Sequence, residues 1–296
     1  MITDAVLIGA MAEPGAVVGI LAGGGPLPGQ VAAAARAAGR GVFLVGLEGY
    51  AEASVLKPYP HAIARLGAAG QILALLRNAR VRDLVLVGPV RRPSVFDLRP
   101  DAEGVRIMAR VGRAAFGGDD GLLAAVVRVL AEEGFNVVGA HEILTEALGP
   151  SGCLTRAGPD AQAQADIDRG AAVAEALGLV DVGQGCVVQM GIVLAVEAIE
   201  GTDAMLRRAG PLQRPGPGGV LVKRVKPGQD RRADLPTIGP ATIAACVQAG
   251  LRGIAFEAHG TLFTDRAATI ADADAAGIFL VGVVIKPANP GDNRHG

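Results

Sequence analysis

The chain has 296 residues, of which 50% are hydrophobic and 3% aromatic, and its formal net charge is -1. This length suits two ordinary domains, and the scarcity of aromatic side chains predicts a core of Ala, Val, Leu and Ile in which helices pack closely on sheets. The near-neutral charge argues against nucleic acid as a partner. The three cysteines are far apart and form no CxxC pair, which argues against a structural zinc site and a disulfide framework.

The sequence predicts neither a membrane-spanning helix nor a signal peptide. No stretch reaches the roughly 18 consecutive apolar residues that a membrane-spanning helix needs. The first ten residues are apolar but carry Asp4 and no basic residue, so they form a poor signal peptide. We expect residues 1–15 to be an extension outside the fold, residues 287–296 to be a tail, and the protein to be cytoplasmic.

The chain proper begins with a strand, a glycine turn and a helix. An apolar run over 16–22 is followed by a Gly/Pro turn and an Ala-rich helical stretch over 30–38. Such a turn can direct backbone N–H groups and a helix N-terminus towards an anion. It matches neither GxGxxG nor a P-loop, so a tight turn without a ligand is the alternative. The candidate substrate-binding residues of this turn are Gly23, Gly24, Gly25, Pro26 and Leu27.

The rest of the first half alternates strands and helices. Strands are predicted over 40–47, 83–90 and 136–140, and helices over 67–80 and 117–133. This alternation predicts a doubly wound, Rossmann-like α/β domain over 16–145. Three of its loops supply further candidates: Gly88 and Arg91 after a strand, Asp119 and Asp120 before a helix, and His141 at a strand end. For His141, packing or a surface pair is the favoured interpretation and a catalytic role is the alternative.

A change in amino-acid composition marks the predicted domain boundary. Residues 146–160 are rich in Gly and Pro, so we interpret them as a linker to a second α/β domain over 161–286. The expected helices there cover 166–177, 204–209, 237–250 and 266–276. The expected strands cover 186–200 with a bend at Gly191, then 220–226, 253–257 and 278–283.

Charge is concentrated between residues 191 and 234. Lys223 and Lys226 precede a Pro-Gly-Gln turn, and Asp230 and Asp234 follow it. Two lysines and two aspartates on one loop can neutralise a diphosphate, hold a divalent cation or activate water, whereas a solvated loop of mixed charge is the alternative. Upstream, Glu197 and Asp203 are open to a structural explanation as a strand end and a helix N-cap.

Six blocks of the sequence carry a family resemblance. Together they resemble the UDP-2,3-diacylglucosamine pyrophosphatases of the type unrelated to calcineurin-like phosphoesterases. The resemblance covers essentially residues 16–285. The blocks are Leu21–Pro28, Leu86–Pro93, Gly118–Leu123, Asp181–Gln184, Ala195–Asp203 and Lys226–Gly239.

The resemblance implies an enzyme of lipid A biosynthesis. It would hydrolyse the lipid-linked substrate UDP-2,3-diacylglucosamine to UMP and 2,3-diacylglucosamine 1-phosphate with Mg²⁺, and water would attack the β-phosphorus. The substrate would lie between the Rossmann-like domain and a C-terminal domain peculiar to the family. The resemblance leaves open peripheral contact with the inner membrane surface and assembly as a homodimer.

The residues and the resemblance together give the following assignments. The catalytic candidates are Asp234, Asp230, Lys223 and Lys226. The magnesium ligands are expected among Asp234, Asp203 and Glu197, with Asp120 as a further candidate. Besides the glycine turn, the substrate-binding candidates are Gly88, Arg91, Asp119, Asp120, Gly201, Thr202 and Gln229.

Two other functions remain open. One is a non-catalytic module that binds a sugar nucleotide or lipid without cleaving it. The other is an NAD-dependent oxidoreductase, which is disfavoured because the first turn lacks GxGxxG and only Glu48 offers an acid at the end of the second strand.

Overall fold

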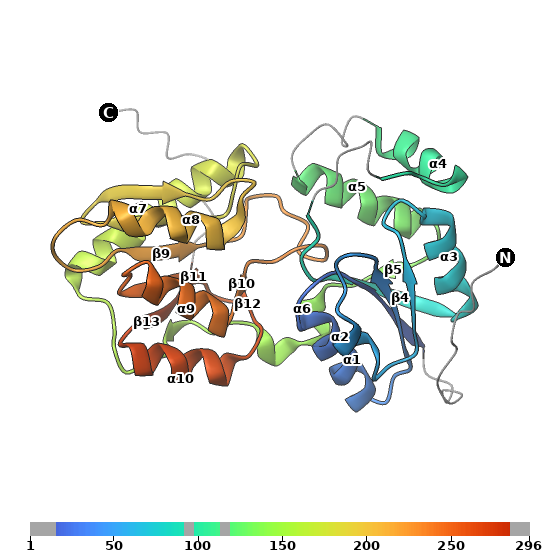
Figure 1. The fold of residues 1–296 in the computed structure, drawn as a ribbon, viewed down its shortest axis with the longest axis horizontal. Helices are drawn as coiled ribbons and strands as arrows, with labels where there is room; N and C mark the ends of the chain where they lie inside the picture. The colour runs from blue at the N-terminus through green and yellow to red at the C-terminus, as the bar shows by residue number, and fades with distance from the viewer. Residues whose placement is uncertain (1–15, 92–97, 113–118, 285–296) are drawn as a thin grey trace. The chain divides into compact units, whose positions relative to one another are not determined.

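The computed structural model describes residues 16–91, 98–112 and 119–284, without the side chains of Asp119 and Asp120. The predicted extension and tail lie outside the described residues. The chain divides into two compact units: unit 1 contains Met1–Thr145 and Gln229–Leu235, and unit 2 contains Glu146–Gly228 and Pro236–Gly296. Each unit has its own sheet (Figure 1) and its own hydrophobic core.

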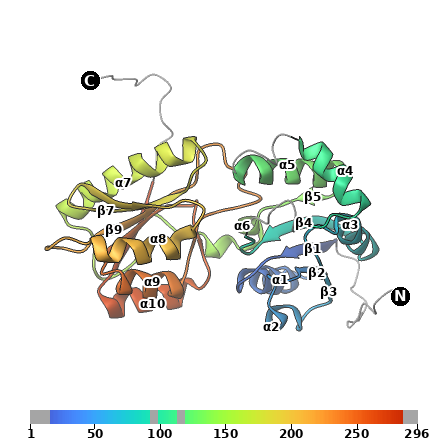
Figure 2. The same cartoon turned by 45° about the horizontal axis from the view of Figure 1, so that its top comes forward.

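Unit 1 is built on a parallel five-stranded sheet in the order β3-β2-β1-β4-β5. Parallel neighbours need crossover connections, and Figure 2 shows α1 on one side of this sheet and α5 on the other. The chain order reverses between β1 and β4, as in doubly wound folds, which confirms the predicted Rossmann-like class. The strands are β1 (Val17–Ala22), β2 (Val42–Leu47), β3 (His61–Ala64), β4 (Val81–Val87) and β5 (Asn136–Val137). The helices are α1 (Leu27–Ala37), α2 (Ala53–Leu56), α3 (Ala69–Asn78), α4 (Ala102–Val111), α5 (Asp119–Glu132) and α6 (Ala140–Ile143).

Three elements of unit 1 were not expected from the sequence. They are α2, β3 and α4, of which α2 and β3 have only four residues each. The Asp101 side chain explains how α4 begins: it accepts a hydrogen bond from Gly104 N at 2.7 Å as N-cap and another from Gly70 N of α3 at 2.9 Å. The strand expected over 136–140 ends at Val137 instead, because α6 begins three residues later.

Unit 2 is built on a mixed six-stranded sheet in the order β6-β13-β11-β9-β7-β8. The strands β9, β11 and β13 are parallel, whereas β7 is antiparallel to both β9 and β8, and β6 is antiparallel to β13. A separate parallel pair joins β10 and β12. The strands are β6 (Gly152–Cys153), β7 (Gly185–Gln189), β8 (Ile192–Val196), β9 (Val220–Lys223), β10 (Thr237–Ile238), β11 (Gly253–Glu257), β12 (Leu262–Phe263) and β13 (Phe279–Val283).

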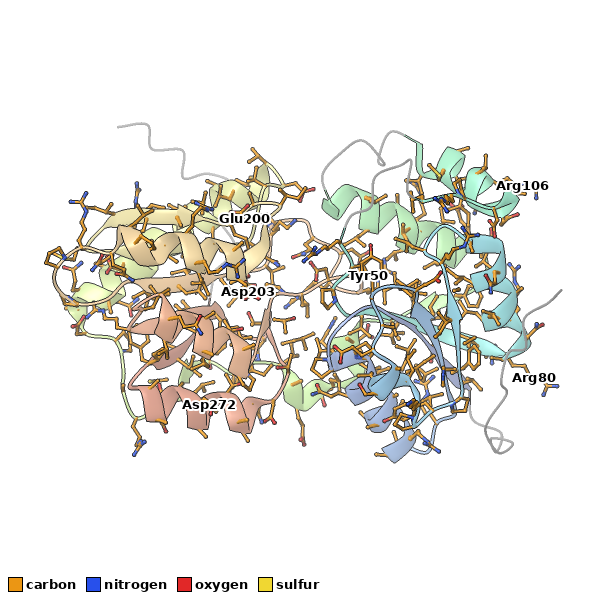
Figure 3. The ribbon with its side chains drawn as sticks, in the orientation of Figure 1. Tyr50, Arg80, Arg106, Glu200, Asp203 and Asp272 are labelled. Atoms are coloured by element: carbon orange, nitrogen blue, oxygen red, sulfur yellow. The ribbon has the colours of Figure 1, made fainter. Side chains whose placement is uncertain are left out.

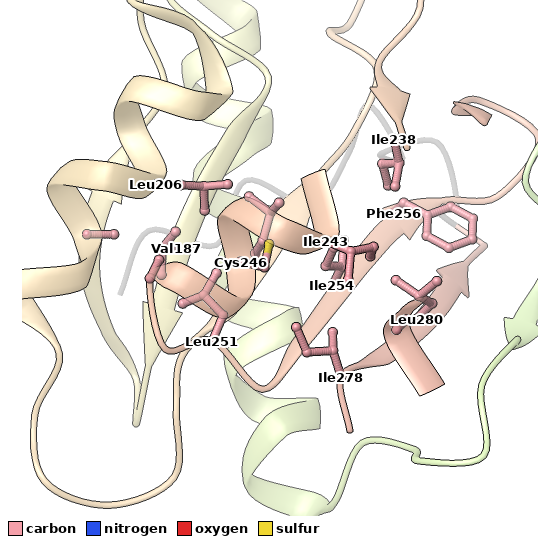
Figure 4. Close-up of a cluster of buried hydrophobic side chains, with 14 of the residues drawn as sticks. Val187, Leu206, Ile238, Ile243, Cys246, Leu251, Ile254, Phe256, Ile278 and Leu280 are labelled. Atoms are coloured by element: carbon pink, nitrogen blue, oxygen red, sulfur yellow. The ribbon is translucent and has the colours of Figure 1, made fainter. Parts of the chain in front are cut away.

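Helices cover both faces of this sheet. One core lies under α7 and contains Ile167. The other lies under the remaining helices, and Figure 4 shows Leu206 of α8 and Ile243 of α9 in the same cluster as Val187 and Ile254 of the sheet. The helices are α7 (Ala161–Leu179), α8 (Gly201–Ala209), α9 (Pro240–Gln248) and α10 (Arg266–Ala276), and short 3-10 turns occur at η2 (Thr145–Ala147) and η3 (Gly210–Leu212). No helix in the described ranges is both long enough and apolar enough to cross a membrane.

The run over 186–200 corrects one expectation about this unit. The predicted division into two segments at Gly191 is confirmed, but the chain reverses its direction there, so that β7 and β8 form an antiparallel hairpin. The chain reverses at Met190 and Gly191, whose φ angles are 50° and 77°. The buried carboxylate of Asp166 accepts hydrogen bonds from both turn N–H groups, at 3.0 and 2.7 Å. This helix residue therefore fixes the turn.

Candidate functional site

One edge of the unit 2 sheet gathers most of the predicted charged residues. Because β8 and β9 are both antiparallel to β7, they end at the edge where β7 begins. Glu197 directly follows β8, Lys223 ends β9 and Lys226 comes shortly after it. We call this the polar edge of unit 2.

At the polar edge, Thr202 joins two buried charged side chains. Its hydroxyl donates a hydrogen bond to Glu197 Oε1 at 2.6 Å and accepts one from Lys223 Nζ at 2.9 Å. Lys223 Nζ also donates to the Thr237 carbonyl at 3.3 Å. Glu197 is only 6% exposed and Lys223 only 4%. We call this arrangement the Glu197–Thr202–Lys223 chain.

The second carboxylate oxygen of Glu197 stands out. Oε2 is buried and has no hydrogen-bond partner among the described residues. Gly185 leaves room beside this oxygen, because a Cβ atom there would lie 2.9 Å from it. A buried carboxylate oxygen is costly unless it is satisfied, so it is suited to accept a hydrogen bond or to face a cation.

Lys226 is also buried, and it is paired. Its Nζ lies 2.6 Å from Asp181 Oδ1 in the turn before β7, and the residue is 8% exposed. The structure thus brings both predicted lysines to one edge, each with a defined hydrogen-bond partner. A lysine held in one place this way has less conformational entropy to lose when it binds an anion.

Asp203 is not the N-cap that was considered for it. Helix α8 begins at Gly201, whose φ is 78°, so Asp203 lies in the first helical turn and Glu200 holds the N-cap position (Figure 3). The Glu200 carboxylate pairs with Arg208. Asp203 is exposed and lines a cavity of about 860 Å³ that lies between α8 and α9. Its charge therefore complements the helix dipole from within the first turn.

The two aspartates after the lysines belong to unit 1 and differ in their surroundings. Arg232 binds both oxygens of Asp230, with Nε 2.9 Å from Oδ1 and Nη2 2.7 Å from Oδ2. This pairing lowers the pKa of Asp230 below its usual value. Asp234 Oδ2 accepts a hydrogen bond from Gln229 Nε2 at 3.3 Å. Asp234 stays the first candidate to hold a cation or orient water, because it follows the two lysines on the same loop of the chain.

His141 is a candidate that sequence reasoning underrated. Its Nδ1 is buried and has no hydrogen-bond partner in the described part of the chain. Burial lowers the pKa of this histidine, Glu142 opposes that shift and Arg231 adds to it. A neutral imidazole close to the 229–235 segment has the character of a proton acceptor. The sequence around His141 does not indicate this lowered pKa, because burial cannot be read from it and Arg231 is distant in the chain.

The glycine turn of unit 1 has a structural explanation of its own. Gly23 N donates to the Val87 carbonyl at 2.9 Å and Gly24 N donates to the Pro89 carbonyl at 3.0 Å, so these two amides are already used. A Cβ atom on Gly23 would lie 2.3 Å from the Gly88 carbonyl oxygen, which shows how closely the two turns cross. Within the described residues, the N–H groups of Gly25 and Leu27 have no backbone or side-chain acceptor.

The remaining predicted residues lie as follows. The backbone carbonyl of Arg91 accepts a hydrogen bond from the Tyr50 hydroxyl at 3.0 Å, which fixes the chain after β4. Asp119 and Asp120 begin α5, but their side chains lie outside the described part of the structure. In the ranges that the structure describes, no three His, Cys, Asp or Glu residues form a ready-made metal cluster.

The buried cysteines offer no nucleophile. Burial raises the pKa of Cys186 to about 12 and that of Cys246 to about 12. A thiol with such a pKa is protonated at neutral pH and therefore unreactive. Cys153 is exposed and bonds to backbone carbonyls of its own loop.

Comparisons with known proteins agree with this two-part organisation. Residues 17–147 match the family model described as LpxI N-terminal domain, and residues 150–281 match the one described as LpxI C-terminal domain. A protein of Caulobacter vibrioides named UDP-2,3-diacylglucosamine pyrophosphatase LpxI is 44% identical over 272 residues. That alignment covers 90% of this chain and 97% of the relative.

Proposed function

The chain belongs to the LpxI family, and we propose on this basis that it hydrolyses UDP-2,3-diacylglucosamine to UMP and 2,3-diacylglucosamine 1-phosphate, a step of lipid A biosynthesis. The observation that carries the proposal is the 44% identity to the Caulobacter pyrophosphatase over 90% of this chain. The enzyme is of the magnesium-dependent type that is unrelated to calcineurin-like phosphoesterases. The protein acts in the cytoplasm, in peripheral contact with the inner membrane that holds its substrate.

The proposed bond changes are simple. A water oxygen attacks the β-phosphorus, on the sugar side of the diphosphate, and loses its proton to a base. The bond from the β-phosphorus to the bridging oxygen breaks, and UMP leaves with that oxygen. The new oxygen stays on the phosphate of the lipid product.

The residues of the polar edge of unit 2 suit the charge of this substrate. Lys223 and Lys226 are held by Thr202 and Asp181, so their ammonium groups are positioned in advance to meet diphosphate oxygens. The Gly25 and Leu27 amides of unit 1 are donors of the same kind. In unit 1, Asp234 is the residue proposed to orient the attacking water or accept its proton, because it follows the two lysines on the same loop of the chain.

Magnesium is the proposed cofactor. Magnesium usually binds through one or two carboxylates plus substrate phosphates, so a preformed protein cluster is not required. Glu197 has one buried oxygen without a hydrogen-bond partner among the described residues, and the exposed Asp203 follows closely in the chain. Glu197 and Asp203 of unit 2 are therefore proposed as ligands of the ion, which would offset the negative charge of the diphosphate, and Asp234 of unit 1 is proposed as a ligand on the grounds of the family resemblance.

The test is UMP release by the purified protein from UDP-2,3-diacylglucosamine, with Mg²⁺ and with excess EDTA. We expect release with Mg²⁺ and its loss with EDTA. Asp234→Asn should lower turnover by about 100-fold or more, as expected for a residue that orients or deprotonates water. Asp230→Asn is the matched control on the same segment and should retain more activity.

Two outcomes would contradict the proposal. Protein that retains lipid but releases no UMP would favour a sugar-nucleotide carrier. Turnover by Asp234→Asn equal to wild type, with unchanged thermal unfolding, would remove Asp234 from the mechanism. Assembly as a homodimer stays a prediction.

A further inference from the structure

Four large aliphatic side chains are exposed beside the polar edge of unit 2. Ile199 is 90% exposed, Leu179 and Val180 are each 69% exposed, and Val182 is 45% exposed. All four come from the end of α7 or from turns next to strands, rather than from the middle of a helix or sheet face. We call these four residues the apolar rim.

Close backbone packing fixes the apolar rim next to the site. A Cβ atom on Gly178 would lie 2.7 Å from Pro227 Cδ, and one on Gly183 would lie 2.1 Å from the Glu197 carbonyl oxygen. Residues 178–183, which include three rim residues, therefore pack directly against Glu197 after β8 and against Pro227 after β9. The ion pair between Asp181 and Lys226, at 2.6 Å, belongs to the same turn.

The opposite edge of unit 2 provides a comparison. It also exposes apolar side chains, and these are 41% to 51% exposed, which is less than Leu179, Val180 and Ile199 and similar to Val182. They are Met190, Ile192, Leu212 and Val247. Exposed aliphatic surface costs free energy in water, so a group as exposed as the apolar rim is typical of a surface that meets an apolar partner.

We propose that the apolar rim docks on the surface of a phospholipid bilayer, with its aliphatic side chains among the lipid acyl chains. This inference rests on the proposed function, because that substrate carries two acyl chains and is held in a bilayer. A lipid-anchored diphosphate lies just above the acyl region, and in unit 2 the lysines that would meet it border the rim. The apolar rim thus suits the acyl region of the bilayer, and the polar edge suits the diphosphate of the substrate.

The charges near the rim predict how the contact responds to salt. Lys226 pairs with Asp181, and Arg208 pairs with Glu200 next to Ile199. Their charges are largely balanced within the protein, so attraction to anionic headgroups contributes little. Bilayer contact through the rim should therefore depend on aliphatic side chains and only weakly on ionic strength.

Vesicle sedimentation without substrate tests the proposal. The full-length protein is mixed with vesicles of phosphatidylethanolamine and phosphatidylglycerol at low and high salt, and the bound fraction is measured. We expect wild type to bind at both salt concentrations. The double variant Leu179→Ser, Ile199→Ser should bind at least roughly tenfold more weakly, because two aliphatic side chains lose their transfer free energy. The control Met190→Ser, Val247→Ser should bind as wild type does.

Several results would overturn the proposal. These are a wild type that stays in the supernatant, a rim variant that binds like wild type, and an equal loss in the control. Binding that high salt abolishes would assign the contact to charge instead. Because all four substituted side chains are exposed, thermal unfolding should be unchanged and a folding defect would be visible separately.

A short-chain substrate separates this proposal from the proposed function. On a monodisperse short-acyl UDP-sugar, the rim variant should release UMP at the wild-type rate. A loss there would show that the rim holds the substrate's own acyl chains and would overturn bilayer docking. If wild type binds vesicles but releases no UMP from either substrate, the proposed function fails while the docking result stands.

Discussion

Thr202 links a buried acid and a buried base through one hydroxyl. Its oxygen lies 2.6 Å from Glu197 Oε1 and 2.9 Å from Lys223 Nζ. Without it, neither oxygen of Glu197 would have a hydrogen-bond partner among the described residues, since Oε2 already has none. Leaving such a group unsatisfied typically costs about 1–3 kcal/mol, so Thr202 contributes both to stability and to the position of Lys223.

Substitution of Thr202 tests this role. Thr202→Val keeps the shape and removes the hydroxyl, so we expect a loss of about 1–3 kcal/mol in denaturant unfolding and at least about tenfold lower kcat. Thr202→Ser keeps the hydroxyl and should restore most of both. Equal behaviour of the two variants would show that the hydroxyl does not position Lys223.

His141 makes stability depend on pH. Burial lowers the pKa of His141 in the folded state below its ordinary value of 6.5, so the unfolded chain takes up its proton first as the pH falls. The stabilising contribution is complete above pH 6.5 and is lost as the pH falls through the folded-state pKa. Thermal unfolding between pH 7.5 and 5 should therefore show a smaller decline for His141→Gln than for wild type. Parallel curves would contradict the assignment.

Residue types were predictable at this scale, but their partners were not. The sequence indicated that Lys223, Lys226 and the two aspartates carry chemistry. It did not reveal that the Arg232 guanidinium binds both carboxylate oxygens of Asp230, because this pairing depends on how the chain turns at these residues. The role of Gly23 was similarly hidden, since its amide bonds to a strand end far away in sequence.

At the scale of elements, the β7–β8 hairpin depends on one buried acid. Asp166 is 1% exposed and accepts two backbone hydrogen bonds from the turn at Met190 and Gly191. Asp166→Ala leaves both donors unsatisfied, and we expect it to lower the free energy of unfolding by about 2–4 kcal/mol. Asp166→Asn keeps one acceptor and should lose less. Chemical denaturation measures both, and an alanine variant as stable as wild type would contradict this role.

Long elements were predictable, and short ones were not. Strand β11 and helix α10 have the bounds expected from their apolar patterns. Strands β6, β10 and β12 have two residues each, too few to produce a periodic signal. The β7–β8 hairpin was missed because a Met-Gly turn is a weak signal beside the usual Asn-Gly or Asp-Gly.

At the scale of the whole molecule, the chain does not divide at a single point. Residues 229–235 contact unit 1 although they lie between β9 and β10 of unit 2. Ala233, for example, packs against the core of unit 1. The sequence shows the charge of this segment, but it does not show which unit the segment packs against. The two LpxI models match consecutive ranges, 17–147 and 150–281, and so do not show it either.

The most direct test of the central claim is hydrolysis in ¹⁸O-labelled water. Purified protein is incubated with UDP-2,3-diacylglucosamine and Mg²⁺, and both products are analysed by mass spectrometry. Attack of water on the β-phosphorus predicts one ¹⁸O atom in 2,3-diacylglucosamine 1-phosphate and none in UMP. Label in UMP would place the attack on the other phosphorus, and the absence of both products would contradict the assignment of a pyrophosphatase.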